Sequence, residues 1–122
     1  MRIADWRNHL SDKKEELLPD VRKFSITYKH FSRKEGDCIY VGRSDDDPLA
    51  RPSEYTNNRR NVAERTGRAH NFIQYKIFTG GRRKIKSFDE ECELYHGMSE
   101  AYQREFNHPH RPAGRLCQVC RR

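Results

Sequence analysis

The run Cys38-Ile39-Tyr40-Val41-Gly42 constrains the fold of this chain more than any other stretch. Its β-branched and aromatic residues end at a glycine, and the acidic, proline-containing turn Asp45-Asp46-Asp47-Pro48 follows closely. We therefore expect a buried strand that presents Tyr40 at its exit. Gly42 has no side chain, so we also expect another group to approach the backbone closely there.

Two further strands are expected around this one. The first covers residues 23–29 and is joined to it by the polar turn 33–37, so that Tyr28 faces Tyr40 or its neighbours. The other covers residues 71–79, and its apolar residues on both faces predict a central strand. On its own, the hairpin favours two tyrosines that serve only the core.

The basic run Arg82, Arg83, Lys84, Ile85 and Lys86 follows the hairpin signal Gly80-Gly81. We expect it to return as a short edge strand. Such a run either contacts phosphates or forms a solvated edge that discourages aggregation.

Helical signals surround these strands. Apolar residues at helical spacing predict an amphipathic helix over residues 3–18, stopped by Pro19. Another helix begins near Asp47 or near Pro52, with Arg51 and Tyr55 on one face in the first case. Residues 61–66 are again expected to be helical, ending at Gly67. The capping box Ser87-Phe88-Asp89-Glu90 starts a third helix, whose core stripe is Phe88, Cys92, Tyr95, Tyr102 and Phe106.

Length and charge narrow the class of protein. With 122 residues, we expect a single α/β (α+β) domain in which helices flank a small, three-stranded, mainly antiparallel sheet. Its parts are a covering helix (1–20), the core (21–106) and a tail (107–122). The formal net charge of +7 favours a polyanionic partner, with DNA first and RNA not excluded, whereas no apolar run is long enough to span a membrane. We expect a cytoplasmic protein with reduced or metal-bound cysteines.

The cysteines and histidines near the C-terminus predict a structural zinc site. Cys92 and His96 lie one turn apart on the predicted helix, and Cys117 and Cys120 form a later Cys-x₂-Cys pair. Together they make a Cys₃His set of the kind that binds zinc tetrahedrally. His108 and His110 are alternative fourth ligands, and unrelated reduced cysteines are the alternative to a metal site. Zinc here would fix a tail that has few apolar residues.

One carboxylate stands out on the same helix. Glu91 lies beside the core stripe, three residues after Phe88 and four before Tyr95, while Glu90 is assigned to the cap. A carboxylate at the border of an apolar face needs a metal, a set of donors or a cation as its partner. The simplest alternative for Glu91 is an ordinary ion pair.

The order of these motifs resembles the GIY-YIG nuclease family. Tyr40-Val41-Gly42 matches the second signature of the family, and Ile26-Thr27-Tyr28 stands at the place of the first, without its glycine. Arg51 falls where the family has its helical arginine, Tyr55 where it has a histidine or tyrosine, and Glu91 where it has a metal-binding glutamate.

The resemblance implies a metal-dependent DNA endonuclease. Tyr28 or Tyr40 would act as the base, Arg51 would grip the scissile phosphate, and Glu91 would hold one Mg²⁺ or Mn²⁺. The residues expected to contact nucleic acid are Arg43, Arg59, Arg60, Arg82, Arg83 and Lys84. The alternative is a catalytically silent, zinc-containing module that binds nucleic acid. A regulatory protein whose tail contacts an acidic partner is a third reading.

Overall fold

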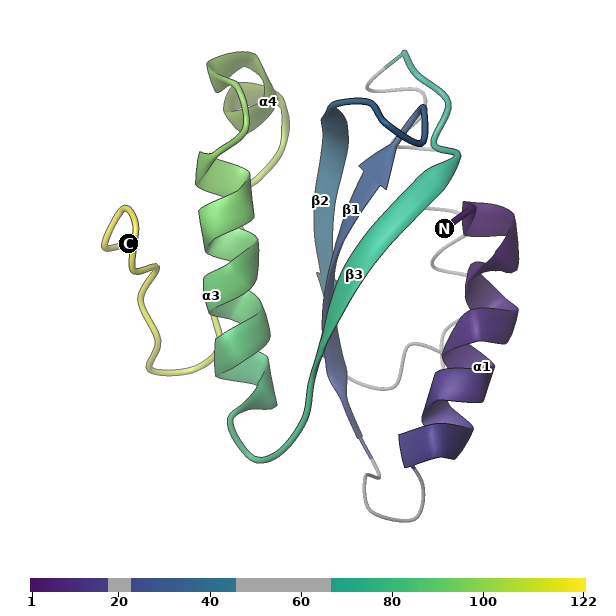
Figure 1. The fold of residues 1–122 in the computed structure, drawn as a ribbon. Coiled ribbons are helices and arrows are strands. Elements are labelled where there is room, and N and C mark those ends of the chain that lie inside the picture. The colour runs from purple at the N-terminus through teal and green to yellow at the C-terminus, as the bar shows by residue number, and fades with distance from the viewer. Residues whose placement is uncertain (18–22, 46–66) are drawn as a thin grey trace.

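A computed structural model describes residues 1–17, 23–45 and 67–122 of the chain. It has the predicted α+β architecture, with helices on both faces of a three-stranded antiparallel sheet (Figure 1). The elements are η1 (Ile3–Asp5), α1 (Trp6–Leu17), β1 (Ser25–Phe31), β2 (Cys38–Ser44), β3 (Phe72–Phe78), α3 (Arg83–His96) and α4 (Glu100–Glu105). The predicted helix with Arg51 and Tyr55 lies outside the described residues.

The sheet has the order β2-β1-β3, so β1 is the central strand. The prediction that the third strand is central was wrong. Strand β3 pairs with β1 on one side, and near Phe72 the N-terminal segment bridges its other side through Arg2. The apolar residues on both faces of β3 are explained by helices above and below the sheet, not by a central position.

Gly42 and Tyr28 face each other across β1 and β2. A Cβ atom added to Gly42 would lie 2.5 Å from the Tyr28 ring. Real Cβ atoms do not approach other heavy atoms so closely, so the ring occupies the space that a side chain at position 42 would need. The predicted close approach at Gly42 is confirmed.

Helix α1 covers one face of the sheet. Trp6 and Leu10 are buried there against a cluster formed by Phe24, Ile26, Tyr28 and Ile73. Helix α1 thus supplies one layer of the core, as predicted, and carries no group of the candidate site.

Helix α3 covers the opposite face (Figure 1). The Thr27 hydroxyl donates a 2.7 Å hydrogen bond to the Ser87 carbonyl of α3. Beyond α4, the chain returns along α3 and packs Cys117 against the buried Phe88 and Cys92 side chains. Helix α3 is therefore in contact with both the sheet and the C-terminal tail.

Helix α3 begins at Arg83, four residues before the predicted start. The basic run is thus the first turn of this helix, and the predicted edge strand was wrong. The Ser87 hydroxyl does not cap the helix but donates to the Lys84 carbonyl at 3.1 Å. Glu90 pairs with Lys76 Nζ at 2.9 Å.

The predicted long helix is divided in two. Helix α3 ends at His96, and α4 restarts at Glu100 with Ser99 as its cap, because the Ser99 Oγ accepts a 3.2 Å hydrogen bond from the Tyr102 amide. The Tyr95 hydroxyl lies 2.8 Å from the carbonyl oxygens of Gln103 and Phe106 and holds α4 in place. None of the helices among the described residues has the length and hydropathy that crossing a membrane requires.

Candidate active-site pocket and metal centre

A pocket of about 280 Å³ lies where the outer edge of β2 meets α3, α4 and the tail. Strand β2 contributes Tyr40 and Arg43, and α3 contributes Glu91. The remaining wall is largely aromatic or comes from the tail, with Tyr95, Tyr102, Phe106 and residues 107–110. The Tyr102 hydroxyl accepts a 2.9 Å hydrogen bond from the Val41 amide and so covers part of the β2 edge.

Glu91 is buried in this pocket but only loosely paired. Its side chain is 13% exposed, and its Oε1 lies 3.5 Å from Arg43 Nη1. Among the described residues the carboxylate has no hydrogen-bond donor. Burial, with a smaller contribution from Asp45, raises the Glu91 pKa to about 7, although Arg43 and His108 act in the opposite direction. A second cation beside Glu91 would stabilise its ionised form.

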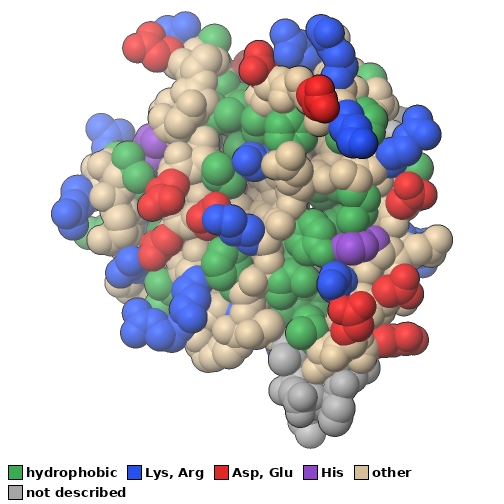
Figure 2. All heavy atoms as spheres, viewed as in Figure 1, with side chains coloured by type: hydrophobic (Ala, Val, Ile, Leu, Met, Phe, Trp, Pro, Cys, Tyr) green, Lys and Arg blue, Asp and Glu red, His purple; other side chains and the backbone are tan. Residues whose placement is uncertain are grey.

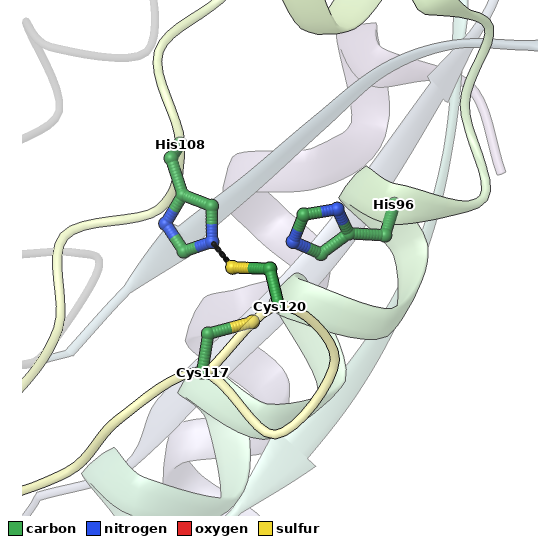
Figure 3. Close-up of side chains that lie close together, drawn as sticks. All are labelled: His96, His108, Cys117 and Cys120. Atoms are coloured by element: carbon green, nitrogen blue, oxygen red, sulfur yellow. Dashed lines mark hydrogen bonds between the residues drawn. The ribbon is translucent and has the colours of Figure 1, made fainter. Parts of the chain in front are cut away.

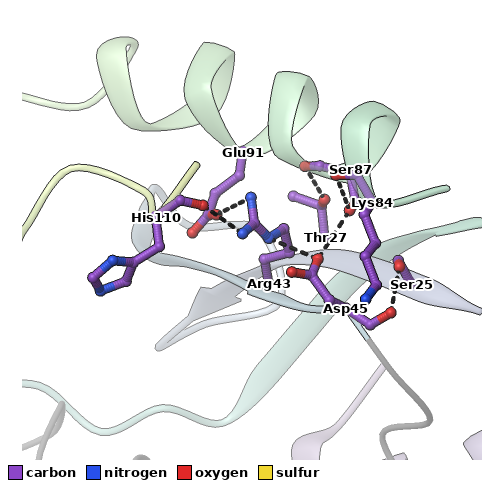
Figure 4. A network of polar contacts seen from close by, with 8 residues as sticks. All are labelled: Ser25, Thr27, Arg43, Asp45, Lys84, Ser87, Glu91 and His110. Carbon is purple, nitrogen blue, oxygen red and sulfur yellow. Dashed lines mark hydrogen bonds and ion pairs between the residues drawn. The ribbon is translucent and has the colours of Figure 1, made fainter. Parts of the chain in front are cut away.

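Arg43 lies at the centre of a polar network (Figure 4). Its Nε donates to Asp45 Oδ1 at 2.9 Å, and its Nη2 donates to the His110 carbonyl at 2.6 Å. The guanidinium also lies over the Phe88 ring, 5.2 Å from its centroid. With a side chain only 9% exposed, Arg43 ties β2 to the tail and lines the pocket, and its predicted contact with nucleic acid stays a prediction.

The network extends to the first turns of α3. Asp45 Oδ1 also lies 3.4 Å from the Ser87 hydroxyl oxygen, as an alternative acceptor to the Lys84 carbonyl, and the Asp45 carbonyl accepts from the Ser25 hydroxyl at 2.6 Å (Figure 4). These contacts fix the exit of β2 against α3. As a result, Arg43 and Glu91 are held on opposite walls of one pocket.

The two predicted catalytic tyrosines are placed differently. Tyr40 packs against both the α1 core and the Tyr95–Phe106 cluster at the β2 edge, where it lines the pocket. Tyr28 is 5% exposed and packs with the core under α1. Because its neighbour Thr27 faces α3, Tyr28 points to the other side of the sheet from Glu91. Tyr40 pairs with His30, so it lies on the Tyr28 face, and the centroids of the two tyrosine rings are 6.3 Å apart. As a residue of the edge strand, Tyr40 also lines the pocket that holds Glu91, which Tyr28 does not.

A buried histidine pair beside these tyrosines was not predicted. His30 Nδ1 and His70 Nδ1 lie 3.0 Å apart, and the His30 ring is stacked on Tyr28 with its centroid 5.4 Å from that of Tyr40. His70 precedes β3, forty residues beyond its partner. No local pattern could have joined the two, because only the pairing of β1 with β3 brings them together.

The tail and α3 form a cluster of potential metal ligands (Figure 3). Its members, whose ligand atoms all lie within 4.8 Å of one another, are His96, His108, Cys117 and Cys120. Cys120 Sγ and His108 Nε2 are 3.4 Å apart. Ordinary zinc–sulfur and zinc–nitrogen bonds at the tetrahedral angle would separate such atoms by about 3.5 Å. The cluster therefore fits a tetrahedral metal ion such as zinc.

Two details of the histidines agree with metal binding. His108 Nδ1 lies 3.0 Å from the Pro109 carbonyl, and donation to this oxygen leaves Nε2 free of a proton and able to bind metal. His96 Nε2 is buried and has no hydrogen-bond partner among the described residues. A buried, unpaired ring nitrogen is costly unless a metal completes it.

In the structure, His108, one of the two predicted alternatives, takes the place of Cys92 in the ligand cluster. Cys92 is 1% exposed and lies on the same α3 stripe as Phe88, packed against Cys117 outside the group of four. Burial raises the Cys92 pKa, which keeps this thiol protonated. His110, the other alternative for the fourth ligand, lines the pocket but is not part of the cluster.

Cys117 has the electrostatics of a metal-binding thiolate. Burial alone raises its pKa, but the backbone amides of Cys120 and Val119, with the His108 and Cys92 side chains, outweigh burial and lower the pKa to about 6. The Cys117 amide also donates a 2.9 Å hydrogen bond to the Arg122 carbonyl, which closes the turn that contains both cysteines.

The other predicted nucleic-acid contacts lie elsewhere. Arg82, Arg83 and Lys84 are at the start of α3, where Arg82 and Lys84 are exposed and Arg83 is half-buried. Arg51, Tyr55, Arg59 and Arg60 lie outside the described residues, so their predicted roles stay predictions.

The fold and site define an α+β protein with a three-stranded antiparallel sheet, a largely aromatic pocket that contains Glu91 and Arg43, and a Cys₂His₂ cluster that could bind a metal such as zinc. Comparisons with protein-family models, with curated proteins and with solved structures found no match. The resemblance to GIY-YIG nucleases therefore stays a prediction from the sequence.

Proposed function

We propose that this protein is a metal-dependent DNA endonuclease whose active site is the pocket between β2 and α3. The observation that carries the proposal is the state of Glu91, a buried and loosely paired carboxylate that shares the pocket with Tyr40 and Arg43. The net charge of +7 and the motif order that resembles GIY-YIG nucleases support a polyanionic substrate.

Glu91 is the residue that would hold Mg²⁺ or Mn²⁺, because hard divalent ions prefer carboxylate oxygens. Such an ion supplies charge neutralisation at the phosphate and an activated water. Binding is favoured by the cost of burying this carboxylate, since a cation would return its pKa toward the ordinary range.

Tyr40 is the tyrosine assigned to proton transfer, since Tyr28 does not reach the pocket. A phenol with a pKa near 10 becomes a useful base only beside positive charge. Arg43 provides positive charge on the same wall, and it also keeps the tail in place through the His110 carbonyl. The phosphate-gripping role remains with Arg51, outside the described residues.

We further propose that the Cys₂His₂ cluster binds zinc in a structural role. Four protein ligands close the coordination sphere and leave no position for a substrate. The tail from residue 107 onward then gains its order from the metal, and with it the tail wall of the pocket.

The decisive experiment replaces Glu91 by glutamine. Glu91→Gln should fold, retain its zinc and bind DNA at least as well as the parent, because it keeps the size and removes a negative charge. Nicking of supercoiled plasmid in Mg²⁺ or Mn²⁺ should fall by orders of magnitude.

Glu93→Gln is the matched control. Glu93 lies on the same helix and is exposed outside the pocket, so the same change of charge should leave cleavage intact. Full activity of Glu91→Gln, or equal losses in the two variants, would refute the proposed role of Glu91.

A catalytically silent nucleic-acid-binding module is the second candidate. The Arg43–Glu91 ion pair and the placement of Tyr28 on the opposite side of the sheet favour it. A parent protein that binds DNA but cuts neither plasmid nor single strands in Mg²⁺ or Mn²⁺ would decide for this candidate.

A further inference from the structure

A second hollow, of about 490 Å³, lies beside the metal cluster on the tail side of α3. Its lining includes His96, His108 and Cys120 of the cluster, together with Arg111 and Arg122. We call this hollow the tail groove. None of its arginines is among the predicted nucleic-acid contacts.

The tail is unusually one-sided in charge. Residues 106–122 contain four arginines and no aspartate or glutamate. One of them, Arg115, is bound to Asp89, with nitrogen–oxygen distances of 3.1 and 2.6 Å. Arg111 and Arg122 are exposed, and their side chains have no hydrogen bond or ion pair within the described part of the chain.

Metal binding would not cancel this charge. Two thiolates balance the charge of one Zn²⁺, and neutral histidines add none. The basic character of the tail therefore persists in the metal-bound protein. In Figure 2, Lys and Arg side chains lie along the left margin, on the side where Figure 1 places the tail.

The tail groove lies next to the candidate active-site pocket, with one wall in common. Both are lined by Tyr95 and by the segment His108, Pro109 and His110. A strand that occupies the pocket can thus cross this segment and enter the groove. An acidic protein would also match the charge of the groove. The neighbouring pocket, however, favours an extended strand that contacts both hollows.

We propose that the tail groove binds the phosphate backbone of the substrate strand next to the pocket, through Arg111 and Arg122. The proposal rests on the proposed function for the identity of the substrate. It assigns the metal-pinned tail a direct part in binding, in addition to its structural role.

The test compares Arg111→Gln/Arg122→Gln with a control, Arg7→Gln/Arg33→Gln. Arg7 of α1 and Arg33 of the β1–β2 turn are exposed, and their side chains also lack partners among the described residues. The two variants lose the same charge, so any difference between them reports position. The probe is a 20-base-pair duplex, and affinity is measured by anisotropy between 50 and 200 mM salt.

The tail variant should bind roughly tenfold more weakly at 100 mM salt, and its slope of log affinity against log salt should be shallower by about 1.8, or about 0.9 per lost phosphate contact. The control variant should keep the slope of the parent. Zinc content and melting temperature verify folding. If the double variant loses zinc, Arg111→Gln alone, which leaves the turn of residues 117–122 unchanged, should reduce the slope by about 0.9.

Equal slopes for the tail variant and the parent would overturn the proposal, as would a tail variant that loses affinity for polyglutamate but not for DNA. These results are separate from the test of the proposed function. If the parent never cuts DNA but the slopes are as predicted, the groove proposal stands and the endonuclease proposal fails. If the parent cuts DNA and the tail variant has the same slope as the parent, only the groove proposal fails.

Discussion

Glu91 differs from an ordinary helix carboxylate because it is largely buried, yet its oxygens accept no hydrogen bond from the described residues. The Arg43 guanidinium divides its donors among Asp45, the His110 carbonyl and Glu91, and the contact to Glu91 is the longest of the three at 3.5 Å. Arg43 Nη1 has no hydrogen-bond partner among the described residues. The pair is therefore well suited to separate when a stronger cation or a phosphate enters.

The raised pKa of Glu91 predicts a pH dependence of stability. The folded state holds this proton more tightly than the unfolded state, because the pKa is about 7 when folded and 4.5 in the reference state. The stabilisation is thus complete below pH 4.5 and is lost as the pH rises through 7. Between pH 6 and 8, without added divalent ions, the parent should lose about 1 kcal/mol of unfolding free energy relative to Glu91→Gln.

Urea unfolding of both proteins at each pH measures this difference. The unfolding free energy of Glu93→Gln should follow that of the parent across the same range, because Glu93 is exposed. A difference between the parent and Glu91→Gln that stays constant from pH 6 to 8 would contradict the assignment.

At the scale of elements, α3 connects the sheet to the tail. Its inner stripe buries Phe88, Cys92 and Tyr95, whereas its last residue, His96, belongs to the metal cluster. One helix thereby orders both the pocket and the tail. Substitutions at its C-terminal end are expected to affect the two together.

The cluster predicts a clear contrast between substitutions of its ligands and a substitution of Cys92. His108→Ala and Cys117→Ser should each lower the zinc content and the melting temperature, because a structural ligand contributes folding free energy. Cys92→Ala should retain about one zinc per chain and lose only the packing of one buried sulfur. Metal analysis of protein prepared without chelators measures the content. Loss of zinc in Cys92→Ala, or retention in His108→Ala, would restore the ligand set predicted from the helix spacing.

At the scale of the whole molecule, α3 lies between two of the places that expose basic side chains. One is the first turn of α3, with Arg82 and Lys84, and the other is the tail with Arg111 and Arg122. In Figure 1, the tail follows α3 on the side away from α1. A duplex that contacts both places would run along α3, past the pocket.

The overall charge predicts binding that weakens steeply with salt. For the parent, affinity for duplex DNA should fall at least tenfold between 50 and 200 mM salt, because neutralised phosphates release counterions. Anisotropy titrations with two unrelated sequences should give similar slopes. No binding at 50 mM salt would contradict both proposed functions.

The sequence by itself determined the parts of this protein whose signals are local. The strand that starts at Cys38, the amphipathic first helix and the Cys-x₂-Cys pair each follow from residues close together in the chain, although β2 continues past Gly42 to Ser44. The position of Glu91 beside the core stripe also followed from its spacing to Phe88 and Tyr95. Periodicity and turn chemistry were sufficient for these features.

Tertiary structure alone decided which of these parts meet. Helix spacing placed Cys92 beside His96, but the stripe that faces the core buried Cys92, and His108 reached the cluster from the tail. Similarly, β1 alternates its side chains between two covered faces, which separated Tyr28 from Glu91 and joined His30 to His70. The physical reason is the same in each case: a side chain's direction is set locally, but its partners are set by long-range strand pairing and by the path of the tail.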